Sequence, residues 1–490
     1  MAARLAGKSS TAVNNPVSLT FKANSIDMSS YRNGFRGIGS SYGNNKHVWS
    51  NDCSIPEVYR RNLLIKSINA DQAADTVITL NMNQNDYHTE YSDGAWRNQG
   101  AGLFVDFHFT DRCKVKHLKI SGNIKLGLFD TNTNSNLMCV TRRSNPEVHI
   151  GVGGFAARTA NSAGTVSFDG LHLEYINVYG GTMTGGAIGY IDGYKNAARN
   201  VSFTNWTIQN ENVTNWVNND GSTGGLVGWN IGYGQLTITG NEGGSENVKN
   251  VKNVNRLSVT THAESFYTAA AGGLVGANDF SSVKVENVSA QNLSVSGKNL
   301  RDLGGLLASG RKGGTFEVKK CSLTSMKITL EINSNQKSSS ACTGGIIGYH
   351  EGPLTISEVV ITSDSVINGQ QFTGGFVGYS AVDVTIRDSS EENLNIKTDM
   401  NWIGGFIGYV NPNRTATFRN CQEKNVNILG RYTGGLVGAM DGSIQASNME
   451  FYNVTGVTYN KDNGYAALLV GNTETILRIR TLTKSMDIIC

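Results

Sequence analysis

Four acidic residues recur at one position of a repeated glycine motif, and clustered carboxylates are what polysaccharide-cleaving enzymes need for acid–base chemistry. Each lies seven residues after the first glycine of its copy: Asp192, Asp279, Glu351 and Asp441. Other copies hold different residues there: Ile231, Arg311, Ala381 and Asn411. Three of the four acids directly precede a glycine, as turn residues do. We therefore favour turns over a catalytic or ion-binding column.

Motifs of other catalytic or metal sites do not occur in the sequence. The zinc motif His-Glu-x-x-His is missing, and the one His-Glu pair, His350-Glu351, runs directly into Gly352-Pro353, which indicates a turn. Phosphate-binding Gly-x-x-x-x-Gly-Lys loops and calcium-binding Gly-Gly-x-Gly-x-Asp repeats are missing as well. The sequence thus predicts a protein that is not an enzyme and has no catalytic, cofactor or metal residues.

Aromatic residues share a second repeated position, five residues after the first glycine of a motif copy. They are Tyr190, Trp229, Tyr349, Tyr379 and Tyr409. The last three belong to consecutive copies, so we expect them to stack as a ladder. If exposed, such a ladder would bind sugar rings or a protein partner. The alternative is that it only supports neighbouring tyrosines or a flanking loop.

The seven cysteines contain no Cys-x-x-Cys pair, and an odd number cannot all pair within one chain. Cys321 and Cys421 each follow the first glycine of their copy by seventeen residues. We interpret them as small apolar residues of one repeated core position rather than as disulfide or metal residues.

These positions are defined by a Gly-Gly-apolar-apolar-Gly repeat. The clear copies begin at Gly224-Gly225, Gly272-Gly273, Gly344-Gly345, Gly374-Gly375, Gly404-Gly405 and Gly434-Gly435. Weaker copies begin at Gly153, Gly185 and Gly304, and a degenerate one spans 467–471. The last four clear copies are spaced by 30 residues, whereas earlier spacings run from 32 to 48. A regular coil with insertions in some loops has this pattern.

Two short alternating segments follow each glycine motif. After Gly374 they are Val382–Ile386 and Asn393–Lys397, and alternation of apolar and polar residues is typical of a strand with one buried face. The composition, with 58 Gly, 5 Pro and 17% charged residues, also favours a β-protein. We predict an all-β fold: a right-handed parallel β-solenoid, or three-sided β-helix, with about 30-residue coils and capped ends.

The glycine motif itself offers two apolar columns. If it formed one extended strand, only one column would face the core. The other column, either Val377 and Ile407 or Phe376 and Phe406 with their equivalents, would then form an apolar ridge on the outside. Such a ridge usually marks an interface, so we expect it to be covered by protein, possible lateral self-association included.

The repeat divides the chain into three predicted parts. Residues 1–150 lack the motif but contain alternating segments such as Val105–Phe109 and Val115–Ile120, and we expect an N-terminal cap with the first irregular coils. Residues 151–471 form the repeat solenoid, and residues 472–490 close its C-terminal end. Terminal coils are expected to be atypical because an open end exposes strand edges and core.

Charge and hydropathy limit the class of partner. The net charge is +3 with both signs interspersed, which argues against nucleic acid. No apolar stretch is long enough to span a membrane, so we expect no membrane insertion within this chain. The first residues do not resemble a signal peptide, and we expect a segment of a longer secreted protein, extracellular or at a cell surface.

Asparagines are frequent, and five match the N-glycosylation pattern: Asn200, Asn205, Asn212, Asn287 and Asn453. We expect chance matches and stacked asparagines to explain them.

At the glycine motifs the chain resembles the GLUG repeats of bacterial cell-surface proteins, which also occur in the non-catalytic region of immunoglobulin A metallopeptidases. The segment Phe35–Gly39 with Val77–Asn81 resembles the stretch that leads into such arrays. The resemblance implies a structural, adhesin-like module that acts through repeat packing and contacts with protein or glycan. The alternatives are a non-catalytic accessory domain of a secreted metallopeptidase and a polysaccharide-cleaving β-solenoid.

Overall fold

The computed structural model describes residues 17–28, 64–70, 75–84, 100–126, 151–159, 164–180, 182–193, 198–217, 221–241, 252–263, 269–333, 340–398, 400–458, 465–467, 469–473 and 486–488. Within these ranges the secondary structure is β-strand throughout, with no helix. Accordingly, the part of the chain that is described contains no helix long and apolar enough to cross a membrane.

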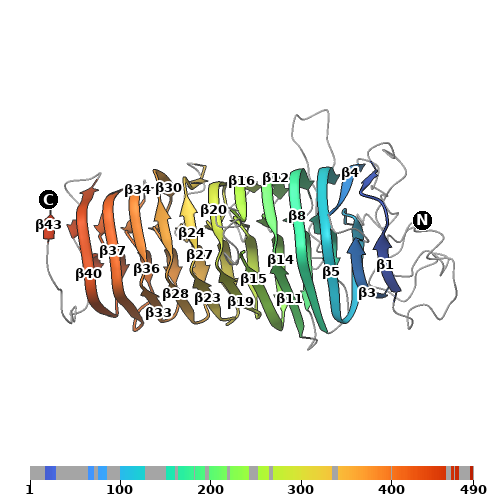
Figure 1. Ribbon diagram of the computed structural model, residues 1–490. Helices are drawn as coiled ribbons and strands as arrows, with labels where there is room; N and C mark the ends of the chain where they lie inside the picture. Colours follow the sequence, from blue (N-terminus) through green and yellow to red (C-terminus); the bar gives the residue numbers. More distant parts are fainter. Residues whose placement is uncertain are drawn as a thin grey trace, which may run out of the picture.

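The strands stack in parallel along a rod, in which the chain advances from the blue N-terminal end to the red C-terminal end (Figure 1). Each strand pairs with its equivalents one coil earlier and one coil later. Gly374, for example, pairs with Gly344 on one side and with Gly404 on the other. The predicted all-β parallel solenoid is therefore confirmed.

One coil illustrates the architecture. It begins with β31 (Phe372–Gly374) and continues through β32 (Val377–Ser380), β33 (Val384–Arg387) and β34 (Ser390–Thr398). We call the ten-stranded sheet that contains β31 the first wall, the strands that stack with β32 the second wall, and the strands that stack with β33 and β34 the third wall. The next coil repeats the order with β35 (Trp402–Gly404), β36 (Ile407–Val410) and β37 (Thr415–Gly430).

The glycine motif is a corner between the first and second walls, not a single strand. The chain bends at Gly375-Phe376, between β31 and β32. This bend breaks the alternation of an extended strand, so that Phe376 and Val377 are both fully buried. Our expectation of an exposed apolar ridge is therefore wrong, because both columns lie in the core.

The second glycine of the motif is required by close packing of one coil on the next. A β-carbon placed on Gly405 would lie closer than 3.0 Å to the carbonyl oxygen of Gly435 in the following coil. Real β-carbons do not approach backbone this closely, and a carbonyl in the adjoining corner cannot move aside. The corner therefore excludes any side chain.

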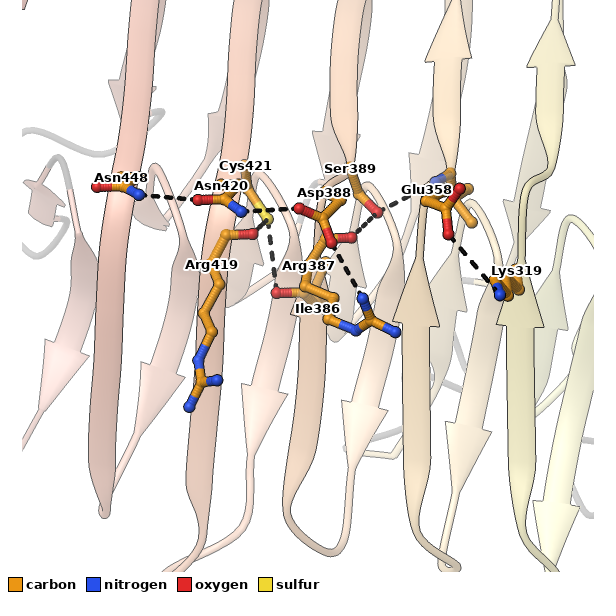
Figure 2. Close-up of polar contacts among 11 residues, drawn as sticks. Lys319, Glu358, Ile386, Arg387, Asp388, Ser389, Arg419, Asn420, Cys421 and Asn448 are labelled. Carbon is orange, nitrogen blue, oxygen red and sulfur yellow. Dashed lines mark hydrogen bonds and ion pairs between the residues drawn. The ribbon is translucent and has the colours of Figure 1, made fainter.

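Left-handed residues bend the third wall at two positions in several coils. Asn420 and Asn425 both have a φ of 52°, a conformation that asparagine tolerates better than most residues. Figure 2 shows the first of these positions, where Asn448 donates to Asn420, and Asn420 donates to Asp388 at 2.8 Å. At the second position, Asn453 donates to Asn425, and Asn425 donates to Asn393, each at 2.9 Å.

Side-chain hydrogen bonds between coils involve three of the five asparagines in glycosylation patterns. Asn453 belongs to the second ladder, Asn212 donates to Asn177 at 2.9 Å, and Asn205 donates to Asp169 at 2.7 Å. The expected stacking of asparagines is confirmed for Asn453 and Asn212, whereas Asn205 bonds to an aspartate.

The described parts of the two ends extend the same sheet. β1 (Val17–Phe21) pairs with β3 (Leu64–Ala70), and β3 pairs with β5 (Phe104–Leu126), which contains both alternating segments predicted there. At the other end, β43 (Met486–Ile488) pairs with β40 (Ser443–Thr458). The segment Phe35–Gly39, part of the resemblance to GLUG repeats, lies outside the described residues.

Candidate functional site

The five predicted aromatic residues occupy one column of the second wall. Tyr190 in β10 (Ile188–Gly193) pairs with Trp229 in β14 (Val227–Gly232). Tyr349 in β27 (Ile347–His350) pairs with Tyr379, and Tyr379 pairs with Tyr409. Between the two groups the column holds Ala277 and Ser309. The structure thus brings the aromatics together in two groups rather than in one ladder.

The larger group is a stack of three tyrosines. Ring centroids lie 5.2 Å apart for Tyr349 and Tyr379 and 5.1 Å apart for Tyr379 and Tyr409, with ring planes tilted by 33° and 32°. All three side chains are partly exposed. The ladder therefore lies on the outer side of the second wall, facing away from the core.

A second aromatic column was missed by the sequence reasoning. Phe372, Trp402 and Tyr432 each begin a strand of the first wall, two residues before the first glycine of a motif. Phe372 stacks on Trp402 at 5.2 Å and 8°, and Trp402 stacks on Tyr432 at 6.4 Å and 23°. Aligning the repeats two positions upstream of the glycines would have revealed this column.

The two columns contact each other across the corner. Phe372 meets Tyr379 edge-to-face at 4.9 Å, and it also lies 5.0 Å from Tyr409. Trp402 lies 5.7 Å from Tyr409. We call the combined surface the aromatic strip, made up of Tyr349, Phe372, Tyr379, Trp402, Tyr409 and Tyr432.

Ring faces of the strip are largely covered by other side chains of the protein. Within the ladder, Tyr379 lies between its two neighbours. At one end the Arg311 guanidinium lies 4.5 Å from the ring centre of Tyr349, and at the other end that of Arg431 lies 5.1 Å from the ring centre of Tyr432. The strip therefore offers ring edges and hydroxyl groups rather than open aromatic faces.

The tyrosine hydroxyl groups are held as hydrogen-bond donors. Tyr349 donates to Glu351 at 2.8 Å, and Tyr379 donates to Asn411. Burial, and then the hydrogen bond to Glu351, raise the pKa of Tyr349 well above its ordinary value. Burial raises the pKa of Tyr379 to about 12. Both phenols are therefore neutral at physiological pH.

The smaller aromatic group belongs to a closed apolar cluster. Tyr190 is 3% exposed and packs with Met183, Ile231 and Trp229 in a cluster separate from the main core. Tyr190 is therefore placed to stabilise its own coils rather than to contact a partner.

The acidic residues do not form a catalytic pair through the strand register. In β18 (Val275–Asp279), Asp279 pairs with Ile231 on one side and Arg311 on the other. Lys312 separates Asp279 from Glu351, because its Nζ lies 3.1 Å from the Asp279 carboxylate and its backbone N–H donates to Glu351 at 2.8 Å. The backbone of Asp192 pairs with Ile231, and Asp441 lies in the bend between β39 (Val437–Met440) and β40.

His350 is buried, and it lies beside the turn that the sequence predicted. Its Nδ1 donates to the Gly352 carbonyl oxygen at 2.9 Å. Burial lowers the pKa of His350 to about 4, so its ring is neutral near pH 7. Within the described ranges, no group of three or more His, Cys, Asp or Glu side chains could hold a metal ion.

A polar chain near the N-terminal end was also missed. Asp75 lies 3.7 Å from Nδ1 of His117 in β5 and 3.4 Å from Nε2 of His172 in β8 (Gly164–Gly180). His172 Nδ1 lies 2.8 Å from the hydroxyl of Thr207 in β12 (Thr207–Val217). This chain links consecutive coils, and sequence separations as large as 97 residues hid it.

The predicted core cysteines are confirmed. Cys321 and Cys421 are free, and 2% and 1% exposed. The Cys421 thiol contacts the carbonyl oxygens of Ile386 and Arg419 (Figure 2), and burial raises the pKa of both thiols to about 12. Cys113 and Cys342 are also free and buried, whereas Cys53, Cys139 and Cys490 lie outside the described residues.

Comparison with protein-family models, with curated protein sequences and with solved structures found no match to this chain. The resemblance to GLUG repeats therefore rests on the glycine motifs and the segments that precede them.

Proposed function

We propose that the protein is a non-catalytic binding scaffold of a cell surface, a segment of a longer secreted protein in which the solenoid presents the aromatic strip to a partner. The observation that carries this proposal is the alignment of five partly exposed aromatic side chains and the buried Phe372 across two walls, with ring contacts between 4.9 and 6.4 Å. The cell-surface location is supported by the resemblance to GLUG repeats.

The geometry of the strip favours a protein partner over a glycan. Sugar rings bind aromatic side chains mainly by stacking on their faces, and here the faces of Tyr349, Tyr379 and Trp402 lie against other rings or Arg311. Aromatic edges and tyrosine hydroxyls are well suited to the mixed apolar and polar surface of a protein. Lateral self-association through an apolar ridge is no longer supported, because both motif columns are buried.

An adhesion assay tests this function. Beads coated with the full chain are applied to arrays of extracellular proteins and of glycans. We expect retention on specific proteins, at least tenfold weaker for Tyr379→Ala with Trp402→Ala and unchanged for Tyr175→Ala, which alters a tyrosine that is 68% exposed and outside the strip. Circular dichroism checks that each variant is folded. Retention on glycans alone, or equal retention of both variants, would contradict the proposal.

A further inference from the structure

An inward side chain faces the second glycine of the motif in eight coils, and in three of them it is a glutamate. A β-carbon on that glycine would meet, in chain order, Ile176, Glu211, Leu257, Leu293, Met326, Ile361, Glu391 and Glu423. Glu211, Glu391 and Glu423 thus occupy a place that five other coils fill with an aliphatic or thioether side chain.

These carboxyl groups are buried without partners. Glu391 and Glu423 are 0% exposed, and Glu211 is 1% exposed. Both oxygens of each carboxyl group lack a hydrogen-bond partner within the described part of the chain. An ionised carboxylate in such a site is very unfavourable, whereas the neutral acid resembles the leucine or methionine of other coils in size.

Two of the three glutamates are direct neighbours. Glu391 in β34 pairs with Glu423 in β37. The residue paired with Glu391 on its other side is Ile361 in β29 (Val360–Thr362), and the one paired with Glu423 is Phe451 in β40. No positive charge is therefore contributed by the flanking strands at this position.

Other titratable groups around the pair do not neutralise it. The corner contributes only the backbones of Gly375 and Gly405, and the buried thiol of Cys421 precedes Glu423 by two residues. Lys424, the residue after Glu423, points outward, where its Nζ lies 2.6 Å from the carboxylate of Glu392. Ionising both glutamates would place two adjacent negative charges in the core.

We propose that Glu391 and Glu423 are neutral, proton-carrying acids at neutral pH, and that they make the coils from Gly374 to Gly434 a part of the solenoid that loosens as pH rises. Burial raises the pKa of both groups, and the neighbouring Glu423 raises that of Glu391 further. In the unfolded chain both titrate near the ordinary value of about 4.3. The stabilising contribution is therefore complete below about pH 4.

Above that pH the unfolded chain releases protons that the folded chain retains. Each carboxyl group then lowers the folding equilibrium constant about tenfold per pH unit, until the folded state also ionises. Alkaline conditions should consequently open these two coils, which carry a neighbouring pair of such groups, before the coils that contain no buried glutamate. This behaviour is opposite to that of an exposed, ion-paired glutamate.

Unfolding by denaturant between about pH 5 and pH 8 provides the test, on the full chain and on the variant with Glu391→Gln and Glu423→Gln. The quantity compared is the equilibrium constant for folding of the coils from Gly374 to Gly434. Across this range we expect it to fall at least 100-fold more in the wild type than in the double variant. Glu392→Gln, which changes the adjacent exposed carboxylate, should retain the wild-type dependence. Equal pH dependence of wild type and double variant would overturn the proposal.

A second measurement does not depend on stability. Infrared spectra at pH 7 should show the carbonyl band of protonated carboxyl groups, and this band should weaken in the double variant and be unchanged in Glu392→Gln. If the glutamine variant fails to fold, Glu391→Ile with Glu423→Leu provides side chains that the same column accepts elsewhere. Spectra in which wild type and variants have the same band, as expected if the pair were ionised and held a cation, would overturn the proposal.

Discussion

At the scale of single residues, the solenoid depends on positions where a side chain is excluded. The second motif glycine faces both a carbonyl oxygen of the next coil and an inward side chain of its own or the next coil. For Gly405 these are the Gly435 carbonyl oxygen and the Glu423 carboxyl group. Loss of glycine here forces the backbone of two coils apart, because neither neighbour is at the end of a freely moving surface side chain.

Gly405→Ala should therefore destabilise the fold by about 3 kcal/mol or more, as expected for overpacking against backbone. The matched control is Gly456→Ala, because its nearest neighbour would be the Thr433 methyl group at 3.2 Å, which can shift. We expect the control to lose less than about 1 kcal/mol. Denaturant unfolding of both variants measures the difference, and equal losses would show that the corner is not closely packed.

At the scale of elements, the third wall contains left-handed bends, and asparagine stabilises these bends in two ways. Its backbone tolerates positive φ, and its side chain continues a ladder between coils. In the ladder at Asn425, its side chain donates one hydrogen bond to Asn393 and accepts one from Asn453, both at 2.9 Å. The bend and the ladder can be separated by substitution.

Asn425→Ala removes both contributions. The free energy of unfolding should fall by about 1–2 kcal/mol because of the left-handed backbone, and further because two side-chain hydrogen bonds are lost. Asn425→Gly restores the backbone freedom but not the ladder, so its stability should lie between that of wild type and that of the alanine variant. Thermal unfolding in one buffer ranks the three proteins. If the two variants were equally unstable, the amide ladder rather than the bend would explain the effect.

The strands of the third wall could be predicted from the sequence because alternation is a local signal. Val382–Ile386 and Asn393–Lys397 correspond to β33 and to the last part of β34. The corner could not be predicted in this way, since Gly-Gly-Phe-Val-Gly is also compatible with an extended strand. Its bend is fixed by packing between coils, and the alternation rule assigned one apolar column to the wrong side.

The site residues can be divided in the same way: those with a local sequence signal could be predicted, and those without one could not. The tyrosine column could be predicted because its distance from the motif is constant. Glu391 and Glu423 pair in the structure although they lie seventeen and nineteen residues after the first glycine of their copies, because the second coil has a longer turn. A comparison at fixed distance from the motif therefore could not align them.

At the scale of the whole molecule, the rod consists of coils that pair only with their neighbours. β32 pairs with β27 and β36, and β36 pairs with β39. In such a stack, stability is a sum of coil and interface contributions, and a local defect does not have to unfold the entire rod.

Val377→Lys with Ile407→Lys places two charges in the core of adjacent coils, where both native side chains are 0% exposed. Since the motif columns are buried, we now expect local unfolding rather than loss of an external contact. Amide hydrogen exchange should accelerate in β32 and β36, while β14, several coils away, keeps its protection. A folded variant with unchanged exchange would contradict the burial of these columns.

The pairing of Gly374 with Gly404 also has a consequence for how the gene can change length. Removing codons 375–404 would join Gly374 to Gly405 and restore an intact Gly-Gly-Phe-Ile-Gly corner, with every later strand meeting the preceding coil in its proper register. Unequal exchange between copies that differ by one whole coil therefore yields a shorter or longer rod with unchanged walls. Exchange between positions that are not equivalent in the two coils shifts the register of a strand and turns core residues outward. Rod length can thus vary by inheritance in steps of one coil. Because residues 375–404 include Tyr379 and Trp402, loss of this coil would shorten the aromatic strip together with the rod.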